Sequence, residues 1–110
     1  MGARSFSQED IIRFSRDIET ARALLIKQKS DDNIILLAQK QAAAAEAYLL
    51  LGDVEESKRY FSFAQLTLKQ AENPETTSEV FERIGKVFAR AGKHSDASGY
   101  FLLAVKTRET

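Results

Sequence analysis

Apolar residues recur along this chain at the three- and four-residue spacing of amphipathic α-helices. One stripe of this period runs through Ile11, Phe14, Ile18, Ala21 and Leu25. Another runs through Val54, Ser57, Phe61, Ala64 and Leu68. No segment shows the two-residue alternation that is typical of a half-buried β-strand. The pattern predicts a fold built from helices alone.

Polar and turn-forming residues divide this pattern into five predicted helices. Ser7, with Asp10 three residues later, has the form of a helix start, and the polar run 31–33 is expected to break the chain after Ser30. Residues 73–77 hold the only proline and are expected to form a loop, with Pro74 well placed at a helix start. The predicted helices cover residues 7–30, 34–51, 54–68, 78–91 and 95–106.

Two segments of the chain, 38–64 and 78–104, repeat one another at a distance of forty residues. The residues that match are Ala45 and Gly85, Tyr48 and Phe88, Gly52 and Gly92, Ser57 and Ala97, Phe61 and Phe101, and Ala64 and Ala104. A small residue lets a neighbouring helix approach closely, and an aromatic fills the space beside it. A repeat of this length indicates stacked helical hairpins, each of which buries its apolar face against the next.

The turns within the two segments have their own signals. Gly52 and Gly92 are expected to end the first helix of each hairpin in the left-handed conformation. Asp53, with Glu56 three residues later, has the form of a capping box at the start of the next helix.

These matched residues resemble the tetratricopeptide repeat. Phe81, Ile84, Gly85 and Phe88 occupy the first-helix places of that family, and Gly92, Ala97, Phe101 and Ala104 occupy its turn and second-helix places. The first segment departs from the family at Gln41, Ala44 and Ser57. The period is longer than the usual 34 residues, as in long-helix variants. The resemblance implies an α-solenoid of about five helices.

The predicted organisation is one domain over residues 1–110. It comprises a flexible N-terminus (1–6), an N-terminal helix (7–30), a first repeat (34–73) and a second repeat (74–107). The N-terminal helix has no hairpin partner before it, so it is expected to cap the array or to complete a half repeat.

Composition and charge exclude several classes of function. The chain has 16 basic and 16 acidic residues, so electrostatic attraction to nucleic acid or to an anionic membrane is not expected. It has no cysteine, and apolar runs such as 34–38 are far shorter than a membrane span. We therefore expect a cytoplasmic protein.

Candidate catalytic chemistry is sparse. His94 is the only histidine and has no neighbour in a metal-binding spacing, and residues 31–33 lack the glycine and distal glutamate of a calcium loop. Gly52 and Gly92 each stand alone in a turn rather than in a phosphate-binding loop. The sequence predicts a protein that is not an enzyme and uses no cofactor.

The resemblance implies a role in binding another protein, as an adaptor or scaffold. In the family, the first helices of successive repeats line a concave groove that holds a peptide or helix of a partner. The corresponding positions are Gln39, Ala42, Glu46, Leu49, Leu50, Glu79, Glu82, Lys86, Ala89 and Arg90. Ala42 and Glu46 stand where some members have a clamp for a terminal carboxylate, which disfavours that ligand. Lys86 and Arg90 are one turn apart and could pair with an acidic group, or be ordinary solvated surface.

A second hypothesis is self-association, as a structural, assembly or regulatory subunit that forms a homo-oligomer. The last helix carries more apolar residues than one neighbouring helix can cover: Tyr100, Phe101, Leu102, Leu103 and Val105. Residues 49–51 at the end of the second helix raise the same question. Scattered surface hydrophobes are the alternative reading, since single exposed apolar residues are common.

Overall fold

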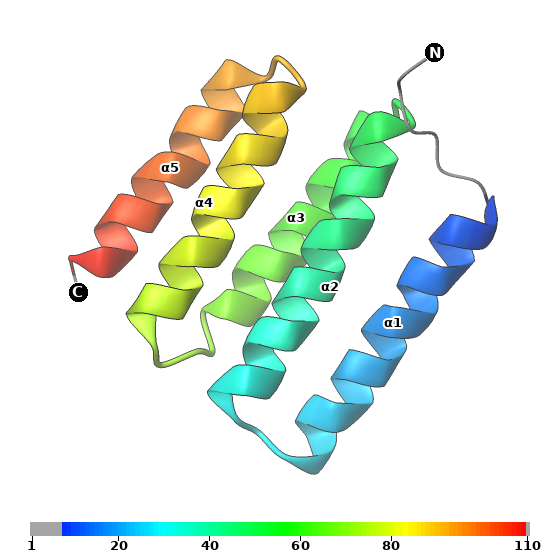
Figure 1. The fold of residues 1–110 in the computed structure, drawn as a ribbon, viewed down its shortest axis with the longest axis vertical. Helices are drawn as coiled ribbons and strands as arrows, with labels where there is room; N and C mark the ends of the chain where they lie inside the picture. The colour runs from blue at the N-terminus through cyan, green and yellow to red at the C-terminus, as the bar shows by residue number, and fades with distance from the viewer. Residues whose placement is uncertain (1–7, 110) are drawn as a thin grey trace.

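The computed structural model of the protein describes residues 8–109, and Figure 1 shows their arrangement. Five helices follow one another: α1 (Gln8–Lys27), α2 (Asp31–Leu50), α3 (Val54–Leu68), α4 (Pro74–Arg90) and α5 (His94–Arg108). The described residues contain no strand. Successive helices run in opposite directions and pack side by side. The predicted all-α fold of stacked antiparallel helices is confirmed.

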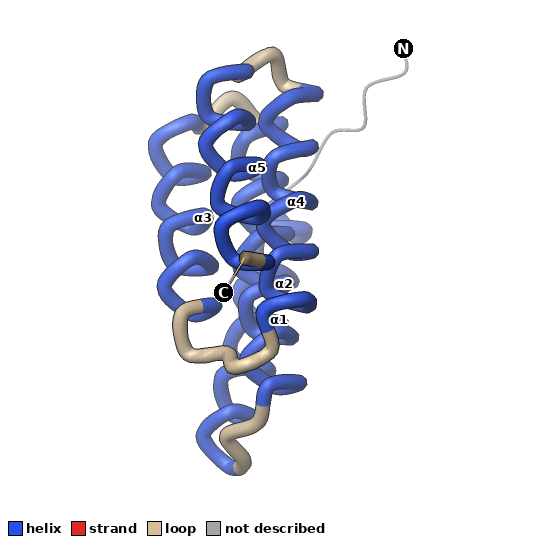
Figure 2. The backbone as a smooth tube through the Cα atoms, turned by 90° about the vertical axis from the view of Figure 1, so that its left-hand side faces the viewer, coloured by secondary structure: helices blue, strands red, loops and turns tan. Residues whose placement is uncertain are grey.

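The helices form two layers. Figure 2 views the molecule from its α5 edge, with α3 on one side and with α4, α2 and α1 toward the other. α4 packs against both α2 and α3, whereas α1 has close backbone contacts with α2 alone among the described helices. α2 and α4 therefore share an exposed surface on the side away from α3. We call it the α2–α4 face; its exposed residues include Gln39, Leu50, Lys86 and Arg90.

α2 begins earlier than the sequence pattern indicated. The Ser30 side chain accepts a hydrogen bond from the Asn33 N–H at 3.2 Å and caps the helix, so Asp31 is its first residue. The polar run 31–33 was predicted to break the chain, and this prediction is wrong: the run is the first turn of a helix. α1 ends at Lys27, and its predicted start at Ser7 lies outside the described residues, as does the predicted flexible segment 1–6.

α4 also begins earlier, at Pro74. The Asn73 side chain accepts hydrogen bonds from the N–H groups of Glu75 and Thr76, at 3.0 and 3.4 Å. Proline suits the first helical position because its missing N–H would have no intrahelical partner there. Pro74 thus stands at a helix start as predicted, but residues 74–77 are helical, so the prediction that they belong to a loop is wrong.

The glycine turns of the two hairpins have one geometry. Gly52 and Gly92 have φ of 87° and 78°, the left-handed conformation that the sequence predicted. In each turn, the N–H of the residue after the glycine donates to the carbonyl of the aromatic residue in the preceding turn, at 2.9 Å in both cases. The forty-residue repeat in the sequence is therefore also a repeat in the backbone.

Only half of the predicted capping box forms at the start of α3. Asp53 caps the helix by accepting a hydrogen bond from the Glu56 N–H at 3.2 Å. The reciprocal bond is absent, since the Asp53 N–H donates to the Tyr48 carbonyl and the Glu56 carboxylate pairs with Arg59 at 3.4 Å.

Aromatic packing repeats in the same way. Tyr48 and Tyr60 stack with ring centroids 5.4 Å apart and an interplanar angle of 18°, and Phe88 and Tyr100 stack at 5.6 Å and 9°. Burial raises the pKa of both Tyr48 and Tyr100, because a phenolate loses more solvation than a phenol. Each hairpin is thus closed by the same pair of stacked rings.

The first hairpin adds polar bonds that the second lacks. The Thr67 hydroxyl donates to Oε1 of Gln41 at 2.7 Å, and the Ser57 hydroxyl donates to the Ala45 carbonyl at 2.7 Å. Gln41, Thr67 and Ser57 are all buried, and these bonds offset their loss of solvation. Gln41 and Ser57, two positions where the first segment departs from the tetratricopeptide pattern, thus each take part in a buried hydrogen bond between α2 and α3.

Two hydrophobic clusters hold the helices together. The larger one joins the two hairpins through Phe61 of α3, whose ring centroid lies 4.7 Å from that of Phe88 and 6.1 Å from that of Tyr100. The smaller one fixes α1 on α2 with Ile18, Ala21, Leu37 and Ala44. The apolar stripe predicted for α1 thus faces α2.

Asp31 connects the start of α2 to the segment before α4. Its carboxylate accepts hydrogen bonds from the backbone N–H groups of Glu72 and Asn73, at 2.9 and 2.7 Å. No local sequence pattern predicts these two hydrogen bonds. Asp31 lies about forty residues before its partners, and the donors are backbone N–H groups, which the sequence does not distinguish. The two hydrogen bonds hold the segment that connects the two hairpins against the start of α2.

We expect Asp31→Ala to lower the free energy of unfolding by about 1 kcal/mol, because hydrogen bonds to a charged group are lost and two N–H groups must find water. Urea unfolding followed by circular dichroism measures the change. Asp32→Ala is the matched control, since Asp32 is an exposed carboxylate in the same helical turn. Equal losses in the two variants would contradict a specific role for Asp31.

Candidate functional site

The α2–α4 face has a shallow notch where the two helices meet. Ala42, Ala43 and Glu46 line it from α2, and Arg83 and Val87 line it from α4. Phe61 and Ile84 close its base. The small alanine side chains create the notch, but the enclosed volume is only about 10 Å³, enough for a single water molecule. The notch is therefore too small to hold a ligand larger than a water molecule.

An ion pair that includes the notch residue Glu46 joins the two repeats. Nη2 of Arg90 lies 3.1 Å from Oε2 of Glu46. These two residues were predicted from separate repeats to line the same groove, and the fold brings them together. A partly exposed pair of this kind adds little stability, but it neutralises both charges.

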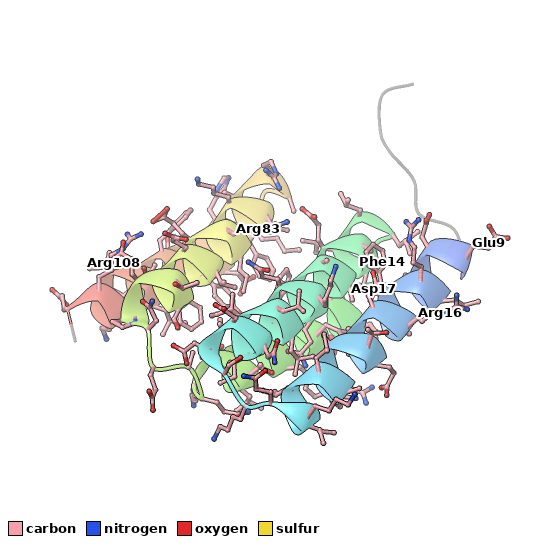
Figure 3. The ribbon with its side chains drawn as sticks, turned by 60° about the horizontal axis from the view of Figure 1, so that its bottom comes forward. Glu9, Phe14, Arg16, Asp17, Arg83 and Arg108 are labelled. Carbon is pink, nitrogen blue, oxygen red and sulfur yellow. The ribbon has the colours of Figure 1, made fainter. Side chains whose placement is uncertain are left out.

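The exposed Glu79 lies one turn before Arg83 on α4, and Arg83 and Lys86 are basic residues of this face. Both are exposed, and neither forms an ion pair with any residue that the structure describes. Figure 3 shows Arg83 on the side of α4 that faces α2. The basic pair that is free to meet an acidic group is thus Arg83 and Lys86, whereas the sequence had indicated Lys86 and Arg90. The signal for Arg83 was present, because residues 83, 86 and 90 share one face of a helix.

The remaining predicted groove residues divide into two groups. Gln39, Leu50 and Glu79 are exposed, and Ala42 is half-buried at the notch. Three others are engaged elsewhere and do not line the notch: Leu49, Glu82 and Ala89.

The structure shows why these three are engaged. Leu49 is buried in the larger core cluster, with 9% of its surface exposed, and the half-buried Ala89 packs against the same cluster. Glu82 lies toward α5, where its Oε2 is 3.0 Å from Nη1 of Arg108. The prediction that Leu49 lines the groove is therefore wrong, because Leu49 is a core residue.

A larger cavity, of about 440 Å³, lies at the opposite end of the hairpins, between the ends of α3 and α5 and the start of α4. Leu68 and Phe81 form apolar parts of its lining, and Lys69 and Glu72 are charged residues beside it. The buried hydroxyl of Thr77 has no hydrogen-bond partner among residues 8–109. A single unpartnered hydroxyl, with the oppositely charged Lys69 and Glu72 nearby, does not favour one kind of ligand. The α2–α4 face is therefore the better-defined candidate site.

The described residues contain no group of three or more histidine, cysteine, aspartate or glutamate side chains arranged to hold a metal ion. His94 is exposed at the first position of α5. Within residues 8–109, none of the helices combines the length and apolar character needed to cross a membrane.

The described residues thus form stacked helical hairpins, with a shallow notch between α2 and α4. Comparisons with protein-family models, with curated proteins and with solved structures returned no match.

Proposed function

We propose that this chain is a non-enzymatic protein-interaction module of the tetratricopeptide type, which holds a segment of a partner protein against the α2–α4 face and acts as an adaptor or scaffold. The repeated hairpins support this role, since stacked repeats present extended surfaces of this kind. The cysteine-free composition is compatible with a cytoplasmic protein.

The observation that carries the proposal is the position of Arg83 and Lys86. They are cations without ion-pair partners among the described residues, and Arg83 itself lines a notch whose other walls are largely apolar. A partner segment that places an apolar side chain over Ala42 and Ala43 would bring a neighbouring acidic group to these cations. The preferred ligand is therefore a peptide or helix with an acidic residue beside an apolar one.

Selection from a random-peptide display library on the immobilised protein tests this proposal. We expect enriched peptides to combine acidic and apolar residues, and Arg83→Glu/Lys86→Glu to weaken their binding at least tenfold, because charge reversal replaces attraction with repulsion.

The matched control is Arg16→Glu/Lys58→Glu, which makes the same change of charge at exposed positions on α1 and α3. Circular dichroism confirms that all variants are folded. Enriched peptides that bind both double variants equally well, or the absence of any enrichment, would rule out this face as the binding site.

A further inference from the structure

The charged side chains of α4 fall into two groups. Glu75 and Glu82 lie 3.8 and 3.0 Å from Arg108 of α5, and Arg90 pairs with Glu46 of α2. The other charged residues of this helix are exposed and form no ion pair with any residue that the structure describes: Glu79, Arg83 and Lys86. Their spacing of four and three residues places them in one stripe along the helix.

This stripe changes sign along the α2–α4 face. α2 and α4 run in the same direction in Figure 1, and Ala43 of α2 and Arg83 of α4 both line the notch. One turn before these residues, the two helices carry the neutral Gln39 and the acidic Glu79, both of which are exposed. The unpaired charge of α4 is therefore negative one turn before the notch and positive at the notch.

Helix geometry fixes the separation of the two charges. Four residues of an α-helix span about 6 Å, so Glu79 and Arg83 are about one turn apart. A partner segment that sends an acidic group to Arg83 therefore brings a neighbouring side chain close to Glu79. A second acidic side chain would be repelled there, whereas a basic one would be attracted.

We propose that Glu79 is a specificity-determining residue of the α2–α4 face, and that the partner segment carries a basic side chain opposite Glu79 and an acidic one opposite Arg83. This inference rests on the function proposed above and restricts its ligand to segments that carry both charges. In a helical partner, the basic and acidic residues are three or four positions apart. In an extended partner they are two positions apart, since a strand rises about 3.3 Å per residue.

The exposure of Glu79 determines which quantity reports its role. An exposed ion pair contributes little to affinity, but a like charge at the same position disfavours the wrong partner. Glu79 is therefore expected to change which peptides bind more than how tightly the preferred ones bind. The test compares peptides that differ in one charge.

Parallel selections from the random-peptide library on the wild type and on Glu79→Lys test the proposal. We expect peptides selected on the wild type to carry a basic residue two to four positions from their acidic one. Peptides selected on Glu79→Lys are expected to carry a second acidic residue in place of the basic one. Glu55→Lys is the matched control, because Glu55 is an exposed carboxylate on α3, and it is expected to select the wild-type pattern.

The binding of one peptide selected on the wild type gives a second readout. Fluorescence anisotropy measures its Kd and the Kd of the same peptide with glutamate in place of the basic residue. We expect the wild type to prefer the original peptide by about fivefold, and Glu79→Lys to reverse this preference. A purely structural role of Glu79 would weaken the binding of both peptides alike and would reverse nothing.

Two results would overturn this inference: wild-type peptides that lack the basic residue, or a preference that Glu79→Lys leaves unchanged. Either result can occur while Arg83→Glu/Lys86→Glu still weakens binding, and then the proposed function stands and only the role of Glu79 fails. A selection on the wild type that enriches no peptide would overturn both.

Discussion

Phe61→Ala is expected to lower the free energy of unfolding by about 3–5 kcal/mol, the largest effect of any single change considered for this protein. Phe61 is 1% exposed, and its ring lies against those of Phe88 and Tyr100, so it connects α3 of the first hairpin with both helices of the second. Removing it would leave a cavity where the hairpins join. A domain of this size is typically stable by only about 5–15 kcal/mol, so the variant is expected to be close to unfolding at 37 °C. Urea unfolding at 25 °C measures the loss.

Phe63→Ala is the control on the same helix. Phe63 is 38% exposed and contacts Tyr60 with a ring separation of 5.7 Å. Because less of its surface is buried and no cavity is enclosed, we expect a loss of about 1 kcal/mol. Similar losses in the two variants would show that the hairpins are not joined through Phe61.

Gly85→Leu is expected to lower the free energy of unfolding by about 2–3 kcal/mol. Gly85 lies where α4 and α5 cross, and a Cβ atom there would lie 2.8 Å from Cε1 and 2.9 Å from Cδ1 of Phe101. A leucine must therefore push the two helices apart or displace the Phe101 ring, and overpacking of this kind is destabilising. Thermal and urea unfolding report the change.

Gly99→Leu makes the same substitution elsewhere in the second hairpin with the opposite expected sign. The space around Gly99 is open, so the higher helix propensity of leucine should stabilise the protein by up to about 1 kcal/mol. Both variants are compared at the same low micromolar protein concentration. A stabilising Gly85→Leu would mean that the close approach of α4 and α5 is not required.

Local signals in the sequence were sufficient for most of the fold. Gly52 and Gly92 have left-handed geometry because a helix that ends tightly needs a residue with positive φ. The apolar stripe of α1 could be predicted because its residues recur with the period of an α-helix. The helix start at Asp31 was missed, and α4 was predicted to begin at residue 78 although Pro74 was recognised as suited to a helix start. Polar residues in a first helical turn look like a loop when the cap before them is overlooked.

Contacts between distant residues account for what the sequence did not show at the site. The ion pair of Glu46 and Arg90 joins residues 44 positions apart, so its existence depends on how the hairpins are offset. Because Arg90 pairs with Glu46, the basic residues of this face that form no ion pair with a described residue are Arg83 and Lys86. Leu49 was placed in the groove by its position in the repeat, but it is buried in the larger core cluster.

Mapping of a bound peptide by backbone-amide NMR tests the central claim most directly. A display-selected peptide is titrated into the ¹⁵N-labelled protein, and shifts are compared along the chain. We predict the largest shifts at the notch residues Ala42, Ala43 and Arg83 and at Lys86 of the same face, with little change on the exposed sides of α3 and α5. Shifts centred on α1, on the cavity lined by Leu68 and Phe81, or on α5 would contradict the assignment of the α2–α4 face as the partner-binding surface.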